Sequence, residues 1–74
     1  MFKKYYALAT GEKGETTLVL KYDGYKIMVY NDETSAKTKL DELCRKDKLE
    51  GKVINLTPLV HMGFISKKQL QIRD

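Results

Sequence analysis

The sequence predicts an α+β fold, in which a four- to five-stranded mixed, mainly antiparallel sheet carries one helix packed on one face. Two runs of alternating apolar residues flank Asp23-Gly24, which is typical of a hairpin. A polar step after Tyr30 then opens a segment whose apolar side chains recur at helical spacing. The expected order of elements is β-β-β-α-β-β, and a chain of 74 residues is expected to form a single small domain, residues 1–74.

The hairpin is expected to turn at Asp23-Gly24. Asp-Gly is a strong signal for a two-residue type I′ turn, because both central residues of that turn need a positive φ. This turn would place six apolar or aromatic side chains on one face, pairing Tyr22 with Tyr25, Leu20 with Ile27 and Leu18 with Val29. We expect this face to pack against the helix.

The helix is expected over residues 32–47, with Asn31 as its N-cap and Gly51 releasing the chain at its end. Its apolar stripe consists of Ala36, Leu40, Leu43 and Cys44. A strand over residues 52–57 should follow. Strand–helix–strand connections across one sheet face are right-handed crossovers, so this strand should run parallel to the third strand.

The two ends of the chain complete the sheet. Residues 3–10 are expected to form the first strand of a three-strand meander, with Tyr6 and Leu8 on the helix-facing side, and residues 10–15 a flexible turn. The apolar run over residues 59–65 has no clear period. Residues 66–69 match a capping box that would open a short helix. The alternation of Leu70 and Ile72 with polar residues favours a final strand instead.

Composition indicates a cytoplasmic protein that has no membrane partner. The only cysteine, Cys44, cannot form a disulfide within the chain, which fits a reducing compartment. The N-terminal residues lack the apolar core of a signal peptide, and no apolar stretch has the length of a membrane span. The Lys- and Tyr-rich composition is typical of AT-rich bacterial or phage genomes, so a phage- or mobile-element-like origin is expected.

The sequence offers no convincing catalytic, cofactor or metal site. Cys44 and His61 are the one pair suited to nucleophilic catalysis, but no third residue would orient them and no oxyanion site accompanies them. They are also too few for a structural zinc site. The acidic residues of the helix are explained by a solvated, charge-paired surface. We therefore expect a protein that is not an enzyme and needs no cofactor.

The second face of the hairpin is the candidate interaction surface. It is expected to combine an apolar-aromatic centre with a ring of cations. Aromatic and basic side chains on an exposed sheet can stack bases and hold phosphates. Tyr and Met are also enriched at protein interfaces. The centre would consist of Tyr5, Val19, Met28 and Tyr30, and the ring of Lys3, Lys21 and Lys26.

Two arrangements of this surface are open. The tail, residues 59–72, could fold over the second face, or the face could stay exposed. An exposed face favours a protein partner or self-association over nucleic acid, since the net charge is only +4. Free strand edges offer a further route to a dimer or to partner capture.

The expected function is therefore that of a small non-enzymatic binding or regulatory module acting through protein–protein contacts. The alternative is a nucleic-acid-binding module that uses the same face together with the basic tail. The tail would contribute Lys67, Lys68 and Arg73.

Overall fold

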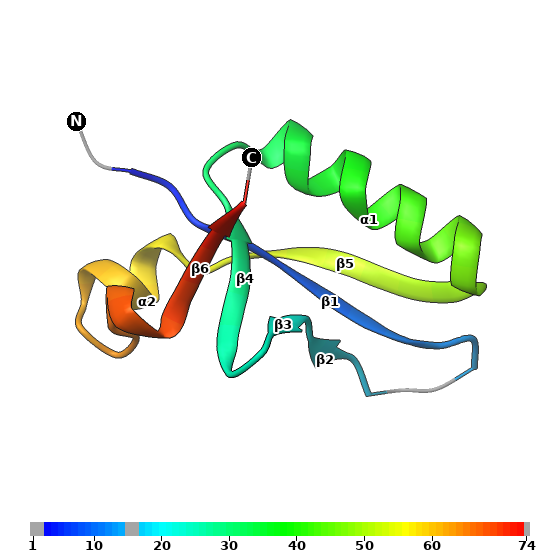
Figure 1. Cartoon of the computed structure of the whole chain (residues 1–74), viewed down its shortest axis with the longest axis horizontal. Coiled ribbons are helices and arrows are strands. Elements are labelled where there is room, and N and C mark those ends of the chain that lie inside the picture. The colour runs from blue at the N-terminus through cyan, green and yellow to red at the C-terminus, as the bar shows by residue number, and fades with distance from the viewer. Residues whose placement is uncertain (1–2, 15–16, 74) are drawn as a thin grey trace.

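The computed structural model describes residues 3–14 and 17–73, which form an α+β fold with one long helix on a six-stranded mixed sheet (Figure 1). The predicted fold class is confirmed. The expected turn at residues 10–15 includes Glu15, which lies outside the described residues. The elements are β1 (Tyr6–Glu12), β2 (Val19–Leu20), β3 (Tyr22–Asp23), β4 (Lys26–Tyr30), α1 (Glu33–Asp47), β5 (Leu49–Asn55), α2 (Thr57–His61), the 3-10 turn η1 (Lys67–Gln69) and β6 (Leu70–Arg73).

Strands β1 and β4 form the centre of the sheet. They pair with each other antiparallel, while β5 pairs antiparallel with β1 and β6 pairs parallel with β4. Because β1 is antiparallel to both neighbours, β5 runs in the direction of β4, as expected, but β1 lies between them. The expected three-strand meander is wrong, because β1 pairs directly with β4, while β2 pairs with β1 and β3 pairs with β4. The Lys21 amide donates to the Leu8 carbonyl at 2.8 Å, and its carbonyl accepts from the Met28 amide at 3.1 Å.

The hairpin turn lies one residue later than expected. Asp23 pairs with Lys26 and Tyr22 with Ile27, so Gly24 and Tyr25 occupy the loop. Gly24 has φ of +67° and Tyr25 has no positive φ, which is the pattern of a type II′ turn rather than type I′. The shift moves each partner by two residues, so the apolar side chains of the hairpin keep their common face.

Helix α1 covers the face opposite to the one expected. The buried cluster beneath it comprises Tyr6, Leu8, Tyr30, Ala36 and Leu40. Tyr6 and Leu8 face the helix as expected, but Ile27 and Val29 do not. The register explains the error: Tyr6 pairs with Tyr30 and Ala7 with Val29, so the apolar positions of β1 and of the hairpin fall on different faces.

The tail covers the other face of the sheet. Leu56 and Leu70 join Tyr5, Ala7, Ile27 and Val29 in a second buried cluster, against which Val60 and Ile65 also pack. The sheet is therefore buried between two layers, which is why the consecutive residues from Tyr5, just before β1, to Ala9 are all buried. The tail does fold over the sheet, on the face that the helix was expected to cover.

The helix termini differ from expectation by short distances. Asp32, rather than Asn31, caps α1, and its carboxylate accepts from the Ser35 amide at 3.0 Å. Asn31 instead donates to the Lys4 carbonyl at 2.9 Å. Helix α1 ends at Lys48, which has φ of 53°. At Gly51 a Cβ atom would lie 2.7 Å from Leu40 Cδ1 and 2.6 Å from the Ala9 carbonyl oxygen, so this glycine lets α1 approach β5.

The C-terminal segment contains both elements that its sequence indicates, a short helical turn and a final strand. Ser66 and Gln69 form the expected capping box, which opens η1, and β6 follows directly as the expected final strand. No helix within the described residues is long and apolar enough to cross a membrane.

Candidate functional site

The structure places five of the seven predicted interaction residues on one side of the sheet and separates the other two from them. Val19, Lys21, Lys26, Met28 and Tyr30 lie on the α1 side of the sheet, as their alternation along the strands requires. Tyr5 belongs to the cluster on the opposite side and is only 2 % exposed. Lys3 precedes β1 and is exposed.

The expected aromatic centre is therefore wrong as a surface, because both of its tyrosines are core residues. Tyr30 is 6 % exposed, buried beneath α1, and Tyr5 is buried beneath the tail. The sequence pattern predicts both tyrosines on one face, which the tail could cover, whereas the register places them on opposite faces beneath different layers. The accessible aromatic rings in the described residues are Tyr22, Tyr25 and Phe64.

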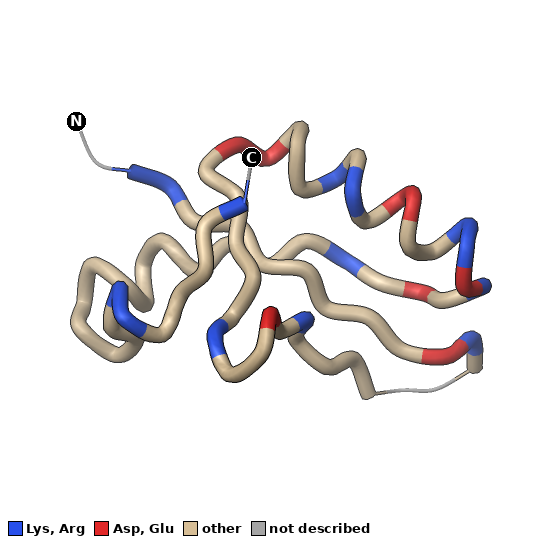
Figure 2. Tube along the Cα trace, viewed as in Figure 1, with Lys and Arg blue, Asp and Glu red and all other residues tan. Residues whose placement is uncertain are grey.

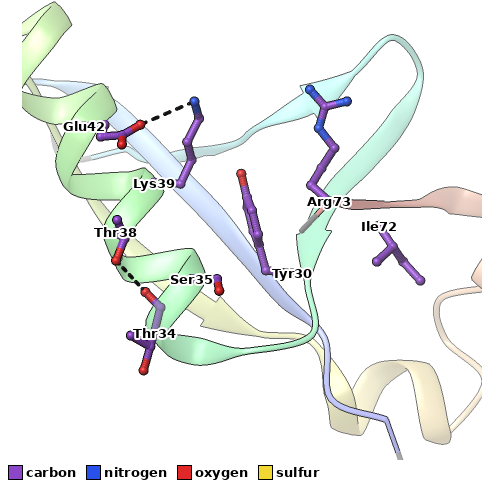
Figure 3. A pocket seen from close by; sticks show the side chains of 8 residues that line it. All are labelled: Tyr30, Thr34, Ser35, Thr38, Lys39, Glu42, Ile72 and Arg73. Atoms are coloured by element: carbon purple, nitrogen blue, oxygen red, sulfur yellow. Dashed lines mark hydrogen bonds and ion pairs between the residues drawn. The ribbon is translucent and has the colours of Figure 1, made fainter.

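A groove of about 630 Å³ lies between α1 and β6, with Tyr30 between its walls (Figure 3). Its cations are already paired: Lys39 Nζ lies 3.6 Å from Glu42 Oε2, and the Arg73 guanidinium donates to Asp23 at 3.0 Å. Burial raises the pKa of the Tyr30 phenol, Arg73 lowers it and Glu42 raises it. The groove can thus offer hydroxyl groups and a protonated phenol to a polar ligand. Its walls are formed by Thr34, Ser35, Thr38, Lys39, Glu42, Ile72 and Arg73.

Helix α2 and the loop after it present the other distinctive surface. Leu59, Met62 and Phe64, named here the α2 loop surface, are exposed, Met62 by 69 % and Phe64 by 70 %. Backbone hydrogen bonds close the loop: the Phe64 amide donates to the Leu59 carbonyl at 2.9 Å and the Met62 amide to the Pro58 carbonyl at 2.9 Å. Val60 and Ile65, from the same segment, pack into the core.

Sequence reasoning missed this loop although a signal for it exists. Pro58 stands in the first turn of α2, and Gly63, with φ of +84°, follows the end of that helix. Proline at the start and glycine past the end are the usual boundaries of a helix. Read together, they would have divided the aperiodic apolar run into a short helix and a turn.

No protein-family model, curated protein or solved structure matches this chain.

The groups considered for catalysis lie apart. Cys44 packs against the cluster under α1, whereas His61 ends α2, which belongs to the layer on the other face (Figure 1). In the described ranges, 3–14 and 17–73, no group of three or more His, Cys, Asp or Glu side chains is placed to hold a metal ion.

Proposed function

We propose that this chain is a small non-enzymatic module that binds another protein through the α2 loop surface. The observation that carries the proposal is the exposure of Met62 and Phe64 on a loop whose neighbouring residues are anchored in the core. Val60 and Ile65 of the same segment pack into the core, whereas Met62 and Phe64 point to solvent. Exposed clusters of large apolar residues are typical of interaction sites.

The loop is organised before any partner arrives. Its hydrogen bonds fix the backbone between Pro58 and Ile65, and the core contacts of Val60 and Ile65 hold both ends. Binding would therefore order few additional degrees of freedom, which lowers the entropic cost of association. Methionine and phenylalanine are also side chains that protein interfaces favour.

The charges beside the loop indicate the chemistry of the partner. Lys67 and Lys68 follow the loop on η1, and both are exposed. A protein with an apolar pocket for Phe64 and acidic side chains at its rim would complement this arrangement. Nucleic-acid binding through the sheet stays a prediction, and the burial of Tyr5 and Tyr30 removes the aromatic surface on which it was based.

Comparative capture tests the proposal. The native chain, the double variant Met62→Ser/Phe64→Ser and the control Tyr25→Ser would each be immobilised and exposed to the same host proteins. We expect the native chain and the control to capture one protein in stoichiometric amounts, and the double variant to capture at least about tenfold less of it. A few apolar anchor residues carry most of the binding energy of an interface, so removing them should remove most of the affinity.

Tyr25 is a matched control because it is 86 % exposed and lies on a different loop. All three proteins should unfold at similar urea concentrations, since surface substitutions usually change stability by less than about 0.5 kcal/mol. Equal capture by all three proteins, or no stoichiometric capture by the native chain, would contradict the proposal.

A further inference from the structure

We propose that the free edge of β5 pairs antiparallel with β5 of a second copy of this chain, about a two-fold axis at Gly51. This surface is separate from the α2 loop surface. The two-fold pairing would join the two sheets into one continuous sheet.

The backbone hydrogen bonds reveal which groups of β5 are free. The Leu56 amide donates to the Tyr5 carbonyl at 2.8 Å, whereas the Leu8 carbonyl accepts from Lys21 on the other side of β1. The odd-numbered residues of β1 therefore bond to β5, and their β5 partners are Glu50, Lys52 and Ile54. The amides and carbonyls of the alternate residues point away from β1: Leu49, Gly51, Val53 and Asn55.

With a two-fold axis at Gly51, the outward-pointing amides and carbonyls of Leu49, Gly51 and Val53 would all form hydrogen bonds with the second copy. Gly51 would exchange hydrogen bonds with Gly51 of the second copy, and Leu49 with Val53 of the second copy, in both directions. Val53 faces the cluster beneath α1, and Leu49 is half-buried on the same side. The pairing would therefore place apolar side chains opposite each other on that face.

The charges on the opposite face favour this register. With the axis at Gly51, Glu50 lies directly opposite Lys52 of the second copy, twice by symmetry. These are non-hydrogen-bonded positions, where Cα atoms approach to about 4.5 Å and side chains are closest. An axis at Lys52 would place Lys52 opposite itself, and an axis at Glu50 would do the same for Glu50, which like-charge repulsion disfavours.

Glu50 and Lys52 have no ion-pair partner within the described part of the chain, and both are exposed. Their neighbours on β1 are the small residues Gly11 and Ala9. Charges of both signs thus lie along β5 beside an uncharged stretch of β1 (Figure 2). Charged residues on an edge strand usually prevent pairing with another strand. Here the antiparallel pairing would instead bring Glu50 of each copy opposite Lys52 of the other.

Helix α1 would form part of the interface. It packs over β5 and β1, and its Leu40 side chain lies directly over Gly51, where an added Cβ would come 2.7 Å from Leu40 Cδ1. The α1 helices of the two copies would therefore lie beside each other on one face of the joined sheet, next to the two-fold axis.

Charge-reversal variants at Glu50 and Lys52, measured alone and mixed, test the proposed pairing of Glu50 with Lys52 of the second copy. Sedimentation of the native chain should show a dimer of twice the 8.6 kDa of one chain. Glu50→Lys and Lys52→Glu should each raise the dimer dissociation constant at least tenfold, because each places like charges opposite. An equimolar mixture of the two variants should regain a dimer at least as tight as the native one, since every cross-strand pair in the mixed dimer is again opposite in sign.

Lys68→Glu, which makes the same charge change as Lys52→Glu on a distant exposed residue, should leave the dimer unchanged. The amides of Leu49, Gly51 and Val53 should exchange more slowly with solvent deuterium as protein concentration rises. A native monomer at 100 µM, a mixture that stays monomeric, or a dimer whose Gly51 amide exchanges at the monomer rate would each overturn the proposal. The last result would indicate another interface, such as the α2 loop surface.

Discussion

Tyr30→Ala is expected to lower the free energy of unfolding by about 3–5 kcal/mol, the range for truncating a large buried aromatic ring. Tyr30 lies in the cluster with Tyr6, Leu8 and Leu40 and is 6 % exposed. For a chain of 74 residues the total stability is roughly 4–11 kcal/mol, so the variant should be marginally folded. Urea denaturation followed by far-ultraviolet circular dichroism measures the loss.

Tyr25→Ala is the matched control, because Tyr25 is the same residue type on the same hairpin but lies in the turn, 86 % exposed. Its effect should stay below about 0.5 kcal/mol. Equal effects of the two substitutions would show that Tyr30 is not covered by α1. The result also decides whether Tyr30 belongs to the core or to the interaction surface that its sequence position predicts.

Leu70→Ala is expected to cost about 2–5 kcal/mol, the range for removing a buried leucine side chain. Leu70 begins β6, pairs with Ile27 and is buried in the cluster beneath the tail, 6 % exposed. Its loss would leave a cavity between the tail and the sheet. Thermal unfolding monitored by calorimetry would report a lower transition temperature.

Ile72→Ala provides the comparison, since Ile72 lies two residues further along β6 and its side chain is 41 % exposed. The loss at Ile72 should be less than half of that at Leu70, because solvent already reaches much of the side chain. A larger loss at Ile72 than at Leu70 would mean that the face covered by the tail has been assigned incorrectly.

The elements of the fold could be predicted from local patterns, but their partners could not. Alternation identified the apolar face of the hairpin, and spacing identified α1 to within one residue at its N-terminus. Both faces of β1 are apolar, however, so its sequence does not show which of its two faces shares a side of the sheet with Ile27 and Val29 of β4. The register Tyr6–Tyr30 and Ala7–Val29 decides which layer covers which face, and it depends on contacts between distant segments.

The same ambiguity explains the outcome for the candidate site. Alternation along the strands predicts Tyr5 and Tyr30 on one face, which the tail could cover, but the register places them on opposite faces of the sheet. The exposed apolar residues, Met62 and Phe64, lie instead in a run that lacks periodicity, where only Pro58 and Gly63 mark the structure. A short loop held by its own hydrogen bonds leaves little signal in hydrophobic spacing.

The two proposals together imply a bivalent particle. Each α2 follows directly after its β5, so antiparallel pairing about Gly51 would place the two α2 loop surfaces at opposite ends of the joined strands. At about 3.3 Å per residue, the surfaces would lie roughly 40 Å apart. A partner with two matching sites, or an array of partners, would then be bound with higher avidity than a single site allows.

The two-layer arrangement is the central claim, and nuclear Overhauser contacts between methyl and aromatic protons test it most directly. The structure predicts cross-peaks from the Tyr30 ring to the methyl groups of Leu40, and from the methyl groups of Ile27 and Val29 to those of Leu70. Cross-peaks between Val29 and Leu40 would instead place α1 on the opposite face and contradict the arrangement.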